Sequence, residues 1–74
     1  MTEQLNSVEK RKIINGLLEQ VMQKHPDLYY SPTTEVARMV HEQLQSTMSR
    51  LPIEDQMLMK KVSVRDVEII LSLN

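Results

Sequence analysis

The C-terminal run from Lys60 to Asn74, KKVSVRDVEIILSLN, restricts the fold more than any other stretch of the chain. Ser63 is followed three residues later by Asp66, a pattern that resembles a capping box, in which two side chains satisfy free backbone N–H groups at a helix start. Val62 and Val67 stand where a hydrophobic staple would place them around the same start. The run therefore predicts a helix over about residues 64–73.

This predicted helix is apolar on most of its circumference. At about 100° per residue, its polar side chains form one narrow arc made by Arg65, Glu68 and Ser72. Such a helix has to be buried, either by the rest of its own chain or by a second chain. A β-strand is the alternative for residues 67–73, because Val and Ile favour sheets. We expect the helix, since a lone strand has no evident pairing partner in this sequence.

The composition favours an all-α domain. The chain has 74 residues, with one Gly, three Pro and no Cys, Phe or Trp. A chain this short buries only about 60% of the surface that it exposes when unfolded. Disulfides and thiolate metal sites are excluded, so stability must come from helix packing or from association. We predict a single helical domain, residues 1–74, with an aliphatic core.

The predicted fold is a small bundle of three to four helices, in which the first two form an antiparallel pair. Apolar side chains at helical spacing and the positions of the prolines place these helices at about residues 2–24, 32–50, 52–60 and 64–73. The first should end near Lys24, because a residue that precedes a proline, here His25, is disfavoured in the α region. Residues 26–30 are expected to form one helical turn.

Two prolines mark the limits of the second helix. Ser31 and Pro32 predict its start, with Ser31 as the capping residue and Pro32 at the first helical position. Pro52 leaves two alternatives open near its end: the helix stops there, or it continues to about Met59 with a kink.

The sequence lacks the patterns that catalysis and cofactor binding require. A single Gly rules out a Gly-rich phosphate loop, and no serine lies in a nucleophile-elbow motif. His25 and His41 have no second ligand at the spacing of a metal site. We therefore expect no enzyme, no catalytic residue, no cofactor, no metal and no small-molecule substrate.

Charge and hydropathy limit the partners. The net charge is −1, which gives no footprint for nucleic acid, whose binding depends on neutralising phosphates. The one basic cluster, Lys10, Arg11 and Lys12, supports the alternative function of a nucleic-acid-binding regulator. No apolar run approaches the roughly 20 residues needed to cross a bilayer. We expect a soluble, cytoplasmic chain that does not bind membranes.

Several apolar residues exceed what one small core can hide. Three consecutive apolar residues at 57–59 cannot all face one core, so at least one should be exposed or covered by another chain. Adjacent tyrosines at 29 and 30 point to different sides, and we expect one inside and one outside. The predicted protein-interface residues are Tyr29, Tyr30, Met57, Leu58, Met59, Ile69, Ile70 and Leu73. The resulting hypothesis is a small non-enzymatic intracellular regulator or adaptor that binds another protein and forms a homodimer.

The segment from Lys60 to Val67 resembles the junction between the long central helix and the last helix of histone-fold proteins, where a basic pair, a Ser or Thr and an Asp-Val dipeptide recur. This resemblance implies one long helix running through Pro52. The same segment is similar to the first half of a helix-turn-helix, whose recognition helix would have to begin at Asn74. The proline and the acidic balance argue against a histone fold, and we assign the chain to neither family.

Overall fold

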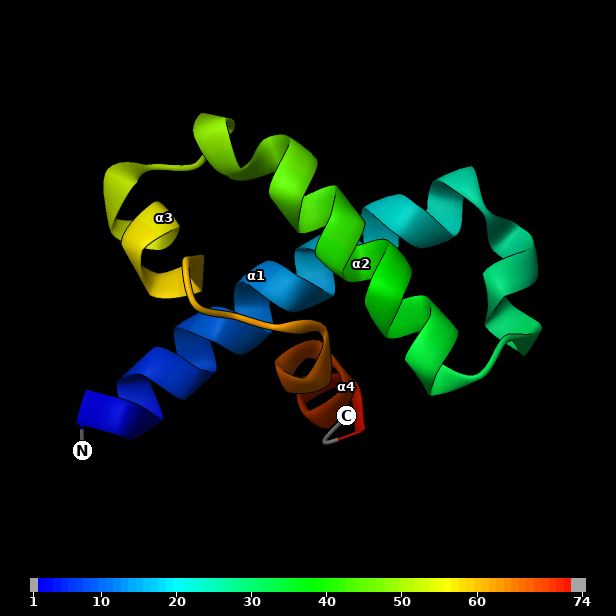
Figure 1. Cartoon of the computed structure of the whole chain (residues 1–74), viewed down its shortest axis with the longest axis horizontal. Helices are drawn as coiled ribbons and strands as arrows, with labels where there is room; N and C mark the ends of the chain where they lie inside the picture. The colour runs from blue at the N-terminus through cyan, green and yellow to red at the C-terminus, as the bar shows by residue number, and fades with distance from the viewer. Residues whose placement is uncertain (1, 73–74) are drawn as a thin grey trace.

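The protein is described by a computed structural model that covers residues 2–72, with side chains from Val8 to Ser72. Its elements are α1 (Thr2–Lys24), the 3₁₀ helix η1 (Pro26–Tyr30), α2 (Thr33–Thr47), the 3₁₀ helix η2 (Met48–Arg50), α3 (Ile53–Met59) and α4 (Val64–Ser72) (Figure 1). No strand occurs within residues 2–72. The predicted all-α class and its four helices are confirmed, and residues 67–72 are helical rather than extended.

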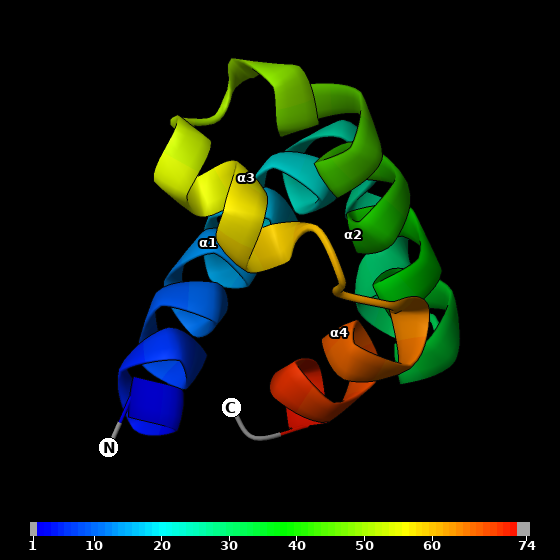
Figure 2. The same ribbon diagram turned by 60° about the vertical axis from the view of Figure 1, so that its left-hand side comes forward.

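The two long helices α1 and α2 pack closely and cross near the middle of the molecule (Figure 1). α4 lies below this crossing, where it contacts α2 extensively and α1 to a smaller extent (Figure 2). α3 contacts α1 at the opposite end of α2 from η1 (Figures 1 and 2). α4 is thus covered mainly by α2 of its own chain.

An aliphatic core fills the space between these helices. Its buried side chains come from all four α-helices, η1 and the segment before α4, and they are Ile14, Leu17, Val21, Leu28, Val36, Ala37, Val40, Leu44, Met59, Val62, Val67 and Ile70. Each large aliphatic side chain that is fully buried stabilises the fold by about 1.5–3 kcal/mol relative to an exposed one. No polar or charged residue is buried among the side chains described.

The capping box at the start of α4 is formed as predicted. The Ser63 N–H donates a hydrogen bond to Asp66 Oδ2 at 3.0 Å, and the Asp66 N–H donates to Ser63 Oγ at 3.2 Å. The first backbone bond of the helix follows, from the Val67 N–H to the Ser63 carbonyl at 3.1 Å. Val62 and Val67 are both buried in the core, as a staple requires.

The start of α2 differs from the prediction. The helix begins at Thr33, and Pro32 is its N-cap, in an extended conformation with φ −63° and ψ 154°. The Pro32 carbonyl accepts hydrogen bonds from the Glu35 and Val36 N–H groups at 3.0 and 3.1 Å. Ser31 instead ends η1, where its N–H donates to the Leu28 carbonyl at 2.9 Å. The prediction that Ser31 caps α2 is wrong, because Ser31 instead caps the C-terminal end of the preceding helix, η1.

The chain breaks at Pro52 rather than kinking. α2 ends at Thr47, the single turn η2 follows, and Leu51 is extended, with φ −74° and ψ 151°. This is the conformation that a proline imposes on the residue before it. The Thr47 hydroxyl also donates to the Gln43 carbonyl at 2.9 Å, a bond that competes with the regular helix ladder. The long central helix implied by the histone resemblance is therefore absent.

Candidate interaction surface

The four most exposed apolar side chains of the described residues occur as two pairs, one on η1 and one on α3. Tyr29 and Tyr30 on η1 are 80% and 91% exposed, and Ile53 and Met57 on α3 are each 73% exposed. Single exposed apolar residues are common on soluble proteins and need no explanation. Two pairs of this exposure, each on one short element, form candidate binding surfaces.

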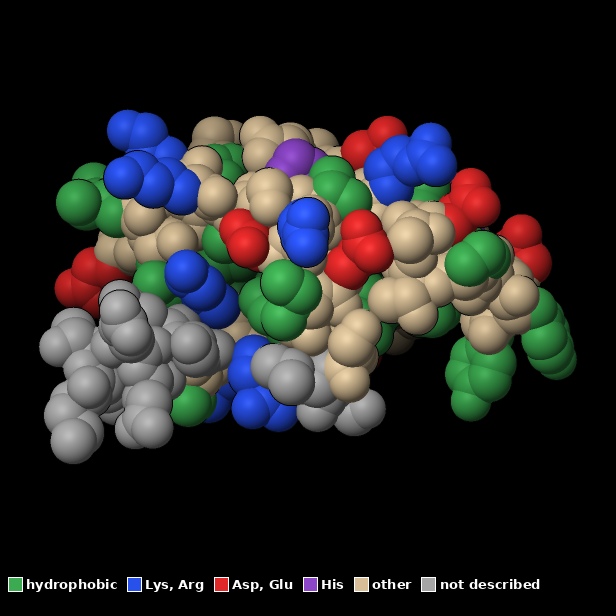
Figure 3. All heavy atoms as spheres, turned by 60° about the horizontal axis from the view of Figure 1, so that its bottom comes forward, with side chains coloured by type: hydrophobic (Ala, Val, Ile, Leu, Met, Phe, Trp, Pro, Cys, Tyr) green, Lys and Arg blue, Asp and Glu red, His purple; other side chains and the backbone are tan. Residues whose placement is uncertain are grey.

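The tyrosine pair belongs to η1, which forms one end of the molecule (right in Figure 1), and hydrophobic side chains project from that end in Figure 3. A 3₁₀ helix has about three residues per turn, so three consecutive side chains point about 120° apart. Leu28 takes the inward direction and is buried at 7% exposure, which leaves both tyrosines outside. Their rings form an edge-to-face contact, with centroids 6.0 Å apart and planes inclined by 65°. The prediction that one tyrosine lies inside is therefore wrong.

An apolar hollow of about 180 Å³ lies beside Tyr29. Its walls come from α1, η1, α2, α4 and the segment between η1 and α2, and the lining side chains are Leu18, Met22, Leu28, Tyr29, Ser31, Thr33, Val36 and Leu71. None of these side chains carries a formal charge. The hollow can therefore accept an apolar side chain next to an aromatic ring.

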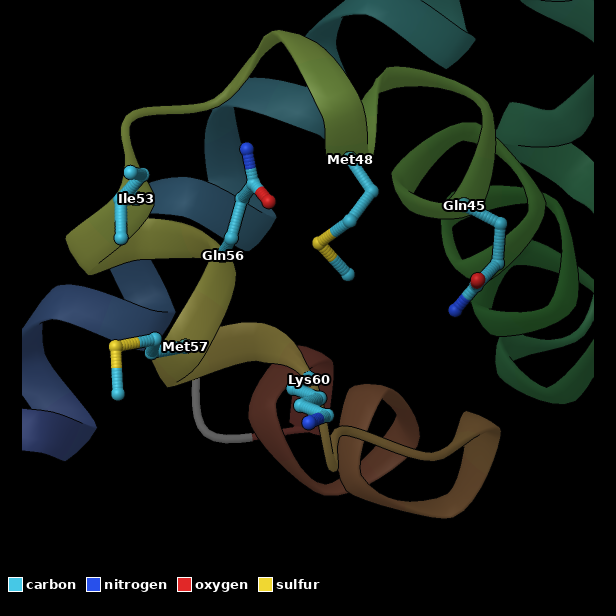
Figure 4. Close-up of a pocket in the computed structure, with 6 residues that line it drawn as sticks. All are labelled: Gln45, Met48, Ile53, Gln56, Met57 and Lys60. Carbon is cyan, nitrogen blue, oxygen red and sulfur yellow. The ribbon is translucent and has the colours of Figure 1, made fainter.

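The second pair lies on the outer side of α3. Ile53 and Met57 are four residues apart, which places them on the same face of the helix. They border an open hollow of about 430 Å³ between α3 and the end of α2 with η2 (Figure 4). Met48 points into this hollow from η2, opposite the α3 wall, and Gln45 lies beside it (Figure 4). Gln56 is held at the α3 wall by a hydrogen bond from its Nε2 to the Leu51 carbonyl, at 2.8 Å.

The three consecutive apolar residues of α3 separate as expected. Met57 is exposed, Leu58 is half-buried and Met59 is completely buried in the core. In α4, Ile69 is 51% exposed, whereas Ile70 belongs to the core. Met59 and Ile70 are thus corrected from interface residues to core residues, because each faces the neighbouring helices of its own chain. Leu73 lies outside the described residues.

Ile53 was missed by the sequence interpretation. It follows Pro52 directly and precedes Met57 by four residues, so the helix start that was predicted at Pro52 already placed both on one face. That face could have been recognised as an exposed apolar ridge. The predicted interface rested instead on the three consecutive apolar residues at 57–59.

In the basic cluster of the alternative function, one of the three cations lies near a carboxylate. Lys12 Nζ lies 3.9 Å from Glu9 Oε1, one turn away on α1, with both side chains largely exposed. Lys10 and Arg11 are half-buried. A surface ion pair of this kind contributes little energy. Its carboxylate partly neutralises the positive charge that would attract a phosphate.

Among the side chains from Val8 to Ser72, no group of three His, Asp or Glu residues could hold a metal ion. His41 has a structural contact, with Nε2 3.1 Å from the Val62 carbonyl oxygen. No helix in the described part of the chain is long and apolar enough to cross a membrane.

Comparison of the chain with protein-family models, with curated proteins and with solved structures gives no match.

Proposed function

We propose that this chain is a small non-enzymatic regulator or adaptor that acts by binding protein, including a second copy of itself. The observation that supports the proposal is the exposure of Tyr29 and Tyr30, at 80% and 91%. Neither ring contributes to the core, whose buried residues between Val8 and Ser72 are all aliphatic or Met. Their apolar area is available for a partner.

Tyrosine is well suited to such a role. Its large ring can be buried on binding at low cost in conformational entropy, and tyrosine is enriched among the residues that dominate binding energy. The edge-to-face contact between the two rings joins them into one aromatic surface that a partner can cover. The apolar hollow beside Tyr29 supplies a complementary pocket on the same surface. The absence of cysteine from the sequence fits a reducing compartment, and we place the protein in the cytoplasm.

The first prediction concerns the double variant Tyr29→Ser/Tyr30→Ser. Because both rings are exposed, we expect the free energy of unfolding to change by less than about 0.5 kcal/mol. Binding of protein partners should weaken by about 10-fold or more. Partners retained by the immobilised unmodified chain would be identified and purified, and their Kd for both forms measured by calorimetry.

Val8→Ser is the matched control, since Val8 is also an exposed apolar residue but lies on α1, at 46% exposure. It should bind the same partners as the unmodified chain. Equal Kd values for the unmodified chain and the tyrosine variant, for every partner, would contradict the proposed role of η1.

A further inference from the structure

The methionines of the described side chains differ widely in their access to solvent. Met57 is 73% exposed, whereas Met59, two residues later on α3, is completely buried in the core. Met22, Met39 and Met48 are half-buried. A thioether is the one apolar side-chain group that a mild oxidant converts into a polar one. Among the described methionines, Met57 is therefore the one that a dissolved oxidant can approach most freely.

The position of Met57 leaves room for the product of such a reaction. Its side chain points away from Met48, which lies across the hollow of about 430 Å³ that both residues line (Figure 4). Its apolar neighbour on the same helix face is Ile53, one turn earlier and equally exposed. An oxygen atom added to the Met57 sulfur would lie in water and would take its hydrogen bonds from the solvent.

We propose that Met57 is a modification site, at which a hydroperoxide oxidises the thioether to methionine sulfoxide. The sulfur attacks the terminal oxygen of the peroxide, the O–O bond breaks and an S=O bond forms. The sulfur loses two electrons to the peroxide. The proton of the transferred oxygen passes to the departing oxygen, so hydrogen peroxide leaves as water. The inference goes beyond the proposed function and does not rest on it, because the tyrosines of η1 take no part.

The same reaction at Met59 would have the opposite consequence for the fold. Met59 belongs to the aliphatic core, where no polar or charged side chain among those described is buried. A sulfoxide oxygen at this position would have no hydrogen-bond partner and would destabilise the folded state. An oxidant can reach the sulfur only when the core opens. Two methionines separated by one residue thus differ in both the rate and the cost of oxidation.

Oxidation of Met57 changes the surface of α3 while the core stays closed. The exposed ridge of this helix consists of Ile53 and Met57. In the oxidised form, one of these two apolar side chains becomes polar and hydrated. Methionine sulfoxide reductases restore the thioether, so the change is reversible. The ridge therefore has an apolar reduced form and a more polar oxidised form on one fold.

The second prediction is tested by treating the full chain with dilute hydrogen peroxide and then mapping its tryptic peptides by fragmentation mass spectrometry. Met57 and Met59 lie in one tryptic peptide, residues 51–60, so each serves as the control for the other. Met57 sulfoxide should form first, about 10-fold or more faster than Met59 sulfoxide, because Met59 reacts only after the core opens. In guanidinium chloride, where the chain is unfolded, both should react at the same rate.

Met57→Leu and Met48→Leu are matched variants, since both side chains line the same hollow but differ in exposure. Met57→Leu should lose the fastest oxidation event, and Met48→Leu should retain it. The chain oxidised at Met57 alone should keep the circular dichroism spectrum of the unmodified chain and elute earlier from a hydrophobic-interaction column. Treatment with a methionine sulfoxide reductase should restore the original elution.

Each outcome decides the assignment. Met57 sulfoxide that forms no faster in the folded chain than the sulfoxides of the buried and half-buried methionines overturns it. A chain that loses its helical spectrum when Met57 alone is oxidised, or that elutes unchanged, overturns the reversible change of the ridge. Neither result bears on partner binding through the tyrosines, whose test involves no oxidant.

Discussion

The structure shows the surroundings of His41 and Gly16, two residues whose roles the sequence did not indicate. His41 Nε2 lies 3.1 Å from the carbonyl oxygen of Val62, which is 21 residues away. A carbonyl oxygen can only accept a hydrogen bond, so Nε2 carries the proton and donates. This bond ties α2 to the segment that leads into α4, directly before the capping box. Gly16, in contrast, stands exposed on α1, and a Cβ at this position would meet nothing within 4 Å.

The third prediction is that Gly16→Ala stabilises the protein. Gly16 has no positive φ, so alanine fits the same backbone, and the change removes the entropy cost of a glycine in a helix interior, about 0.5–1 kcal/mol. For a domain of this size, thermal unfolding followed by circular dichroism should show a midpoint raised by about 4–8 °C per kcal/mol.

Glu19→Ala serves as the control on the same helix, because it replaces one good helix former with another at an exposed position. A lower midpoint for Gly16→Ala would mean that another backbone approaches α1 at this point in solution.

At the scale of elements, α4 shows how a nearly all-apolar helix is covered. Val67 is completely buried and Ile70 nearly so, mainly through contact of α4 with α2 and to a lesser extent with α1. Ile69 remains 51% exposed beside Arg65 and Glu68, in the polar arc seen in the sequence. A helix of nine residues is not stable by itself. The helix therefore depends on the capping box for its start and on contacts with the core for its position.

The fourth prediction concerns that start. Ser63→Ala removes the acceptor of the Asp66 N–H and should lower the free energy of unfolding by about 1 kcal/mol. Urea denaturation measures this loss. Asp66→Ala removes the opposite bond, to the Ser63 N–H, and should cost a similar amount.

Because the two bonds belong to one motif, the double variant should lose less than the sum of the single losses. Strict additivity would show that each side chain acts alone. Ser49→Ala is the control, as an exposed serine in η2, with an expected change within about 0.5 kcal/mol.

At the scale of the whole molecule, the positions of the helices could be predicted from local sequence signals. Which side chains lie on the surface depends on tertiary contacts. The C-terminal end of α1 and the start of α4 follow from Pro26 and the capping box, which act over a few residues. The break at Pro52 was one of two alternatives, because a proline permits either a kink or a stop. Which of Met57 and Met59 faces the core depends on how α3 lies on α1, and no local pattern contains that information.

The radius of gyration also bears on association. It is 11.8 Å, close to the roughly 11 Å expected for a compact chain of this length. The single chain thus closes its own core, and a dimer would add stability to an already folded monomer. Self-association should then appear as a gain in stability with concentration and should not be a condition for folding.

The fifth prediction follows from this linkage. A partner that binds only the folded state raises stability by RT ln(1 + [L]/Kd), about 2.7 kcal/mol at 100 times the Kd. Because the two chains of a dimer share this gain, each chain gains about half of it, and the thermal midpoint of the unmodified chain should rise by about 5–11 °C between concentrations well below the Kd and 100 times the Kd. A concentration-independent midpoint for the unmodified chain would show that the native state gains nothing from a second copy.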